Sequence, residues 1–233
     1  AGRYFATFLC TNVPSKDAPA TDREVGIDLG VKTLATLSDG TKIENPRGLE
    51  RYERKLAREQ RRLSRRKGAR KSEKQSRRYL KQRKRVARIH AKIADARTDA
   101  LHKVTTMLAD ENQVLCMEDL NAKGMMKNHH LAKAVTDASF GEFARLLEYK
   151  CAERGRSLVK IGRFYPSSKT CSVCGHRLDA LSLSVRSWDC PSCGVHHDRD
   201  VNAARNILAE GKRILSNTEG TAGHAGTVAA VVA

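Results

Sequence analysis

Residues 171–206 have the sequence CSVCGHRLDALSLSVRSWDCPSCGVHHDRDVNAARN. Two C-x2-C pairs stand fifteen residues apart in this stretch, and a glycine follows each pair directly. Two short turns of this kind can place four thiolates tetrahedrally around one ion, at about 2.3 Å from it. The spacing therefore predicts a structural zinc ribbon with the ligands Cys171, Cys174, Cys190 and Cys193. Two redox-active cysteine pairs, or a chance arrangement, are the alternatives.

The other cysteines and the two histidines of this stretch receive different interpretations. Cys10, Cys116 and Cys151 lie in apolar contexts without a partner at a ligand spacing, so we interpret them as core residues. Four thiolates already complete a tetrahedral site. His196 and His197 are therefore predicted to be nucleic-acid contacts or surface residues rather than metal ligands.

Composition gives no support for a membrane or secreted protein. The 233 residues are 40% hydrophobic, which suffices for a packed core, and no apolar run approaches the roughly 18 residues of a membrane-spanning helix. No signal peptide opens the sequence, so we expect a reducing compartment, where cysteines bind metal rather than form disulfides. The expected location is the cytoplasm, in association with the nucleoid.

The positive charge is concentrated in one segment. The chain carries 44 Lys and Arg against 26 Asp and Glu, and residues 51–97 alone hold 21 basic and 4 acidic side chains. A solvated surface is the ordinary explanation of such a run. This segment, however, also has apolar residues at helical spacing: Leu56, Leu63, Leu80, Val86, Ile89 and Ile93. It predicts one or two long helices, packed on one side and suited to binding nucleic-acid phosphates on the others.

Hydrophobic patterns predict a mixed α/β fold. Short apolar runs bounded by turn residues predict strands near 25–30, 33–37, 41–44, 114–118 and 157–164. The first three, with a turn at Asp39-Gly40, predict a three-stranded antiparallel start. Helical spacing predicts basic helices over about 50–110, and a helix from Asp200 through Leu208. A further helix should begin with a capping box at 139–142, end at Gly155, and bury Phe143, Leu146, Leu147 and Cys151. This order is ribonuclease-H-like, with a helical insertion and a zinc-ribbon insertion.

Three carboxylates form the candidate catalytic site. Asp28 lies inside an apolar strand, where an ionised group costs several kcal/mol unless it is paired or bound to metal. Glu118 ends a second apolar strand, and Asp200 begins a helix. Each acid alone could be a satisfied buried carboxylate. Together they suit two Mg²⁺ or Mn²⁺ ions that clamp a scissile phosphate and activate a water.

Two neighbouring acids are assigned other roles. Asp198 directly precedes the helix, which favours a helix N-cap. Asp119 follows Glu118 and would point to the opposite face if the strand continued, so it is left out of the site.

Four segments resemble a known family: VGIDLGVKTLAT (25–36), VLCMEDLNAKGMMKNHHLAKAVTDASFGEFARLLEYKC (114–151), YPSSKTCSVCG (165–175) and CPSCGVHHDRDVNAARNIL (190–208). They are similar to the nuclease half of TnpB, a family of transposon-encoded RNA-guided endonucleases, and to the related type V CRISPR effectors. The resemblance covers roughly residues 22–210. It implies that Asp28, Glu118 and Asp200 are the RuvC catalytic acids and that the four cysteines are zinc ligands. It also implies that the basic insertion runs along a guide RNA and its heteroduplex with target DNA.

The resemblance also implies a particular organisation. Residues 1–21 are expected to be a strand, RYFATFLC at 3–10, and a linker that follow an N-terminal recognition lobe lying outside this chain. Residues 22–164 would be the RuvC-like core with its insertion at 50–110, residues 165–198 the ribbon, residues 199–215 the last helix, and residues 216–233 a flexible tail. Without the lobe, the chain is expected to bind nucleic acids broadly and to cleave programmed targets poorly.

The expected function is a metal-dependent DNA endonuclease, RNA-guided in its complete context, with guide RNA and target DNA as partners. Zinc would be structural, and two Mg²⁺ or Mn²⁺ ions catalytic. A non-catalytic TnpB-derived binding protein is one alternative, which loss of an acid would favour. A structure-selective resolvase or transposase is another, and it would need no guide.

Overall fold

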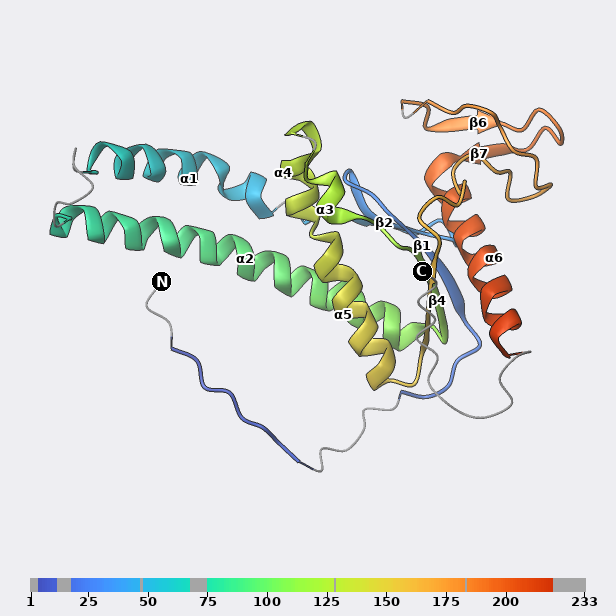
Figure 1. Cartoon of the computed structure of the whole chain (residues 1–233), viewed down its shortest axis with the longest axis horizontal. Coiled ribbons are helices and arrows are strands. Elements are labelled where there is room, and N and C mark those ends of the chain that lie inside the picture. Colours follow the sequence, from blue (N-terminus) through green and yellow to red (C-terminus); the bar gives the residue numbers. More distant parts are fainter. Residues whose placement is uncertain are drawn as a thin grey trace. The chain divides into compact units, whose positions relative to one another are not determined.

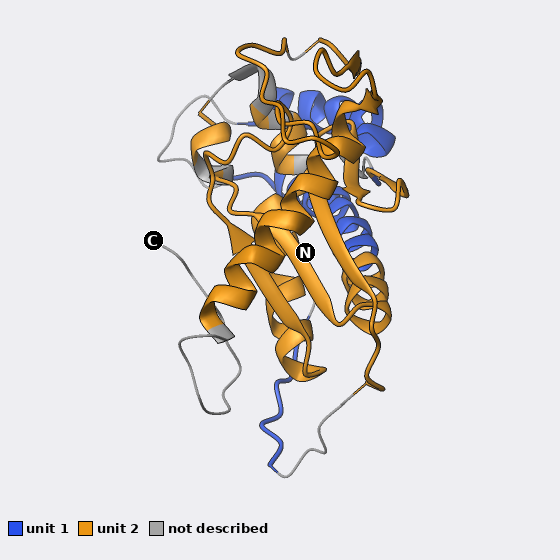
Figure 2. Cartoon of the chain, turned by 90° about the vertical axis from the view of Figure 1, so that its right-hand side faces the viewer, with its two compact units in different colours: residues 1–14, 46–101 blue, residues 15–45, 102–233 orange. Residues whose placement is uncertain are grey.

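The computed structural model describes residues 4–11, 18–46, 48–67, 75–127, 129–182 and 184–219. The chain divides into two compact units (Figure 2). Unit 1 comprises residues 1–14 and 46–101, and unit 2 comprises residues 15–45 and 102–233. Over the described residues, none of the helices combines the length and the apolar composition that crossing a bilayer requires.

Unit 2 is built on a five-stranded mixed sheet in the order β3-β2-β1-β4-β5. The strands are β1 (Glu24–Leu29), β2 (Thr33–Leu37), β3 (Lys42–Glu44), β4 (Val114–Glu118) and β5 (Ser157–Ile161). The first three form an antiparallel meander, as the sequence predicts, while β1, β4 and β5 run parallel. The nearly continuous apolar sequences of β1 and β4 follow from burial on both faces of the sheet.

Helices cover both faces of this sheet (Figure 1). One face packs against α6 (Arg199–Glu219), which contacts β1, β4 and β5. The other packs against α5 (Phe140–Glu153), whose four predicted apolar positions are all buried. The approach of α6 is close: a Cβ on Gly26 would lie 2.0 Å from the Ala204 carbonyl oxygen, and a Cβ on Gly211 would lie 2.3 Å from Cys116 Sγ. Only glycine leaves room for this packing.

Unit 1 contains two helices rich in basic residues, as predicted. They are α1 (Gly48–Arg65) and α2 (Arg77–Glu111), the latter continuing past the unit boundary. Leu56, Val86, Ile89 and Ile93 form its buried apolar cluster, with Tyr52 and Leu63 packed against them. A buried polar contact accompanies this cluster, because Gln82 Nε2 donates to Glu59 Oε2 at 2.8 Å. Leu80 is 40% exposed, so its predicted core position is wrong.

Two further predictions of local structure are also wrong. Residues 4–10, the described part of the predicted first strand, form no strand or helix, and Cys10 is exposed rather than in the core. A strand forms only where a neighbour supplies hydrogen bonds, and no described strand pairs with this segment. Ser139 occupies the N-cap position of α5 but does not form the predicted capping box, because it adopts a left-handed conformation (φ 51°) and its side chain makes no capping bond. Its hydroxyl donates to Thr136 O, at the junction of α4 (His129–Ala138) and α5.

The last helix is longer than predicted. It continues through residues 216–219, which the sequence assigns to the tail, and residues 220–233 lie outside the described residues. The remaining elements are the short helix α3 (Ala122–Met125) and the hairpin of β6 (Ser187–Asp189) and β7 (His196–Asp198). The two strands of the hairpin flank the second cysteine pair, and β7 leads into α6.

Candidate carboxylate site and cysteine cluster

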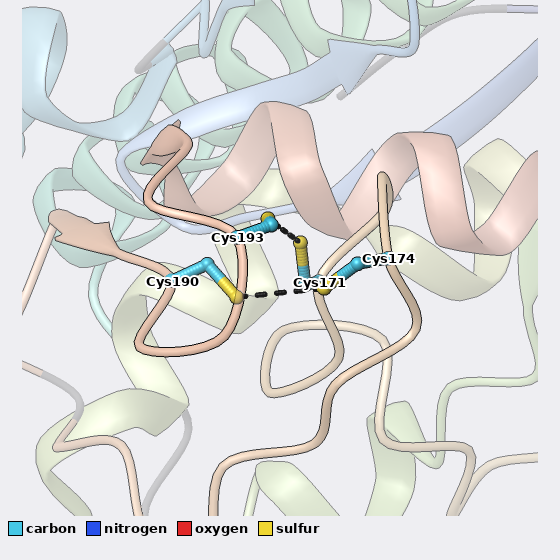
Figure 3. Close-up of side chains that lie close together, drawn as sticks. All are labelled: Cys171, Cys174, Cys190 and Cys193. Carbon is cyan, nitrogen blue, oxygen red and sulfur yellow. Dashed lines mark hydrogen bonds between the residues drawn. The ribbon is translucent and has the colours of Figure 1, made fainter.

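The four predicted zinc ligands come together (Figure 3). Their sulfur atoms all lie within 4.8 Å of one another, with Cys171 Sγ 3.7 Å from Cys193 Sγ and Cys174 Sγ 3.6 Å from Cys190 Sγ. Four sulfurs at about 2.3 Å from a tetrahedral ion are separated by roughly 3.8 Å, so the cluster fits a structural zinc. All four cysteines are free of disulfides.

The two cysteine pairs lie on turns with the same hydrogen bonds. In the first, Gly175 N donates to Cys171 O at 2.9 Å; in the second, Gly194 N donates to Cys190 O at 2.8 Å. Both glycines have positive φ, 75° and 72°, a conformation that other residues rarely adopt. The glycine after each pair is thus required by the turn that aims the thiolates at one point.

His197 is not the surface residue that the sequence predicts. It is buried, its Nε2 lies 3.1 Å from Cys171 Sγ, and its ring centroid lies 4.7 Å from that of Trp188. Burial, followed by the positive charges of Arg205 and His196, lowers the pKa of His197 and favours a neutral imidazole. His196 is exposed, as predicted, and lies 2.7 Å from Asp189. Successive residues of a strand point to opposite faces, and the antiparallel register pairs His197 with Trp188 and His196 with Asp189. This difference in partner explains why His197 is buried while the adjacent His196 is exposed.

The three predicted catalytic acids come from neighbouring elements of unit 2. Asp28 lies on β1, and Glu118 ends the adjacent parallel strand β4, one position beyond the Ile27–Met117 pair. Asp200 lies in the first turn of α6. The pKa of Asp28 is raised to about 8. Burial is the largest cause, and the negative charges of Glu118 and then of Asp200 add to it. Glu118 and Asp200 are thus both close enough to Asp28 to oppose its ionisation.

The carboxylates are spaced more widely than the sulfurs. Among the described residues, the cysteines are the only set of three or more His, Cys, Asp and Glu ligand atoms within 4.8 Å of one another. Two divalent ions about 4 Å apart need carboxylates on both sides of the pair. Carboxylates spaced more widely than the ligands of a single ion suit this arrangement. Oxygen donors of this kind fit Mg²⁺ or Mn²⁺ better than a soft thiophilic metal.

The acids that the sequence leaves out of the site have other partners. Asp198 Oδ1 accepts hydrogen bonds from the backbone N–H groups of Asp200 at 3.0 Å and Val201 at 3.1 Å, which confirms its role as the N-cap of α6. Its Oδ2 also pairs with Lys42 Nζ at 2.7 Å. Asp119 forms an ion pair with Arg163 at 2.7 Å.

Sequence reasoning missed the polar residues around these acids. Ser167 Oγ donates to Glu118 Oε1 at 2.5 Å, and Arg186 Nη1 lies 3.7 Å from Asp200 Oδ1. Burial raises the pKa of Glu118, while the Ser167 hydrogen bond lowers it. Asn202 and Asn206 are buried on α6 and hydrogen bond to the loop that carries Ser167. Their spacing of four residues on an otherwise apolar helix face was the available signal.

Two family models match the chain. One, for the IS605 OrfB type and described as "Probable transposase", covers residues 8–129, which is more than half of the chain. The other is described as "Cas12f1-like, TNB domain" and covers residues 140–207.

The chain belongs to the TnpB family. Among the curated relatives of this TnpB chain, a Streptomyces pristinaespiralis protein named "Putative RNA-guided DNA endonuclease" is 49% identical over 211 residues, which are 91% of this chain and 50% of the relative. InsQ of Escherichia coli K12, which has the same description, is 34% identical over 230 residues, 92% of this chain and 56% of InsQ. The TnpB chain thus spans about half the length of these relatives.

A solved structure supports the mixed α/β architecture of the TnpB chain. The "Cryo-EM structure of the Cas12f1-sgRNA-target DNA complex" matches with a TM-score of 0.56 at 22% identity, covering 84% of this chain and 40% of that one. At this level of identity the likeness concerns the fold alone.

Proposed function

We propose that this chain is the nuclease part of a transposon-encoded, RNA-guided DNA endonuclease with a ribonuclease-H-like (RuvC) core. The observation that carries the proposal is the convergence of Asp28, Glu118 and Asp200, expressed in the raised pKa of Asp28. A meander of three strands, two parallel strands and a covering helix that supplies the third acid support the assignment of the fold. The names of the curated relatives support the activity.

The three acids would hold two Mg²⁺ or Mn²⁺ ions, which supply charge to a scissile phosphate and lower the pKa of an attacking water. Asp28 is the acid most opposed to ionisation, since its burial and its acidic neighbours all disfavour the charged form. A divalent cation held by Asp28, Glu118 and Asp200 would favour the ionised form of Asp28, which would then ligate the ion as a carboxylate. Ser167 keeps one oxygen of Glu118 in place by donating to it.

The cysteine cluster would hold zinc in a structural role. Four thiolates leave no open position for a water or substrate, which is the arrangement of structural rather than catalytic zinc. The ribbon leads directly into α6 through β7, so its metal would stabilise the chain just before Asp200.

Guide RNA and target DNA are the proposed partners. On unit 1, Lys55, Arg85, Arg88 and Lys92 line a hollow of 330 Å³, and the exposed faces of α1 and α2 carry further cations. Such a surface suits phosphates, which position a nucleic acid without reporting its sequence. Sequence choice would then come from guide pairing, as the names of the relatives support.

The test compares four single substitutions. When the chain is fused to the N-terminal lobe of a relative and loaded with guide RNA, Asp28→Ala, Glu118→Ala and Asp200→Ala should each abolish cleavage of a guide-matched plasmid in Mg²⁺. Nucleic-acid binding should stay within about twofold, because each change removes a metal ligand and no basic surface. Asp119→Ala is the matched control, since its carboxylate is adjacent in sequence but paired with Arg163. Wild-type cleavage by any of the first three variants would remove that residue from the site.

Cleavage should be measured with this chain alone and with the N-terminal lobe of a relative fused before it, each with and without guide RNA. We expect programmed cutting only with the lobe and the RNA present. Efficient cutting without RNA would instead favour a structure-selective resolvase, and binding without cutting under all conditions would favour a non-catalytic binding protein.

A further inference from the structure

Two buried asparagines of α6 hydrogen bond to the loop between β5 and the first cysteine pair. Asn202 is 1% exposed and Asn206 is 5% exposed. Asn202 Nδ2 lies 2.8 Å from Thr170 O and 3.4 Å from Ser167 O, and Asn206 Nδ2 lies 2.6 Å and 2.7 Å from the same two oxygens. In addition, Asn202 Oδ1 accepts a hydrogen bond from Ser172 N at 2.9 Å.

The donors of the two asparagine amides match the acceptors of the two loop carbonyls in number. Two side-chain amides offer four N–H groups, and two carbonyl oxygens offer four lone pairs, so each amide can donate to both carbonyls. Because the asparagine amides are buried, losing one of them leaves each carbonyl with a single donor and no water to replace the second. The loop is therefore held on α6 by specific hydrogen bonds rather than by apolar packing alone.

This loop connects the carboxylate site with the cysteine cluster. Ser167, whose carbonyl accepts from both asparagines, donates through its hydroxyl to Glu118. Cys171 of the cysteine cluster follows four residues later. Asp200 lies on the same helix as the asparagines, two residues before Asn202. The contact thus ties the element that carries Asp200 to the residue that holds Glu118.

We propose that Asn202 and Asn206 are positioning residues that, through Ser167, set the place of the Glu118 carboxylate relative to Asp200 for divalent-ion binding. The inference rests on the proposed function, because it concerns the same carboxylate site. Groups that orient metal ligands from outside typically change metal affinity by about 10–100-fold when removed. The asparagines act on Glu118 only through Ser167, so we expect a change in metal affinity near the lower end of that range, about tenfold.

The test measures Mn²⁺ affinity of the zinc-loaded 233-residue chain by electron paramagnetic resonance of free Mn²⁺. Ser167→Ala and Asn206→Ala should each weaken Mn²⁺ binding about tenfold, with zinc content unchanged. The double variant should be little weaker than either single variant, because both changes interrupt one path to Glu118.

Asn112→Ala is the matched control. Asn112 is 6% exposed in the same unit, and its side-chain amide donates to the Leu108 carbonyl at 3.0 Å, at the end of α2 and on a segment other than the Ser167 loop. It should lower the melting temperature and leave Mn²⁺ affinity unchanged. A purely structural role for Asn206 would give the same result as this control.

The outcomes separate this inference from the function on which it rests. Normal Mn²⁺ binding by the wild type with unchanged affinity in Ser167→Ala overturns the positioning role alone. An absence of Mn²⁺ binding by the wild type overturns the proposed function and the positioning role together. Should Asn206→Ala fail to fold, Ser167→Ala still decides, because it removes one hydroxyl and leaves the four amide contacts in place.

Discussion

At the scale of single residues, the carboxyl of the half-buried Asp28 makes the stability of the fold depend on pH. Its pKa is raised from 3.8 to about 8, chiefly by burial and then by Glu118 and Asp200. Between about pH 4 and about pH 8 the folded state therefore retains a proton that the unfolded state has released. Stability from this group is present at low pH and is lost as the pH rises toward 8.

Asp28→Asn should accordingly stabilise the protein increasingly as the pH rises, in buffer to which no divalent ion other than zinc is added. Between about pH 5 and about pH 8 the gain over wild type should grow by about 2–4 kcal/mol, or roughly 5–10 °C in Tm. Thermal melts across this range measure it. A difference that does not change with pH would mean that Asp28 titrates normally.

The two adjacent histidines should differ in their effect on zinc release. A neutral His197 can donate from Nε2 to the Cys171 sulfur, which stabilises a thiolate ligand. His197→Phe keeps an aromatic ring against Trp188 but removes that donor, so transfer of zinc to a chromogenic chelator should become about tenfold faster. His196→Phe is the control and should release zinc at the wild-type rate, whereas Cys171→Ser should fail to retain zinc. Equal rates for both histidine variants would contradict the hydrogen bond.

At the scale of elements, the position of α6 depends on two glycines. Gly26 and Gly211 allow the helix to approach β1 and β4 more closely than any side chain permits. The sequence shows α6 as an amphipathic helix but not how near it lies. The distance between α6 and the sheet decides whether the Asp200 carboxylate lies close enough to Asp28 and Glu118 to share a metal site with them.

Two alanine substitutions at helical glycines should therefore have opposite effects. Gly211→Ala should destabilise unit 2 by about 1–3 kcal/mol, because its Cβ would overlap Cys116. Gly141→Ala in α5 meets no atom within 4 Å and should stabilise by about 0.5–1 kcal/mol, because alanine has less freedom in the unfolded chain. Urea unfolding measures both. Similar effects of the two changes would argue against the close approach of α6.

At the scale of the whole molecule, the excess of cations should govern nucleic-acid affinity. The net charge is +18, and almost all of the excess falls in residues 51–97. Replacing Arg85 and Arg88 together by Gln should weaken binding to any duplex and make the plot of log affinity against log salt less steep by about 1–2, because fewer counterions are released. Fluorescence anisotropy at several salt concentrations measures the slope.

A control of equal charge change is available on unit 2. Arg145 and Arg213 are paired with Glu142 and Glu210 at 2.6 Å and 2.7 Å. Replacing these two by Gln lowers the net charge by the same amount and should leave the slope unchanged. An equal loss of slope in both double variants would mean that total charge, rather than the surface of α1 and α2, determines binding.

Much of the fold could be predicted because it follows from local periodicity. The meander, β4, α5 and the basic helices each have a hydrophobic pattern that matches one period, and the structure has them in the predicted order. Predictions failed where a local pattern lacked a tertiary partner or acquired an unexpected one. The predicted strand at 3–10 has an apolar pattern, but none of the described strands pairs with its described residues 4–10. Ser139 lies between two abutting helices instead of at a free helix start.

The sequence by itself determined the cysteine cluster, the N-cap of α6 and the elements that carry the three acids, because each depends on spacing within a short stretch of chain. Only the tertiary structure decided that Asp28, Glu118 and Asp200 interact, that His197 is buried against Cys171, and that Asn202 and Asn206 hold the Ser167 loop. These contacts join residues separated by 26 or more positions, or depend on how closely α6 packs on the sheet. Such packing is set by the summed burial of many side chains, which no single motif encodes.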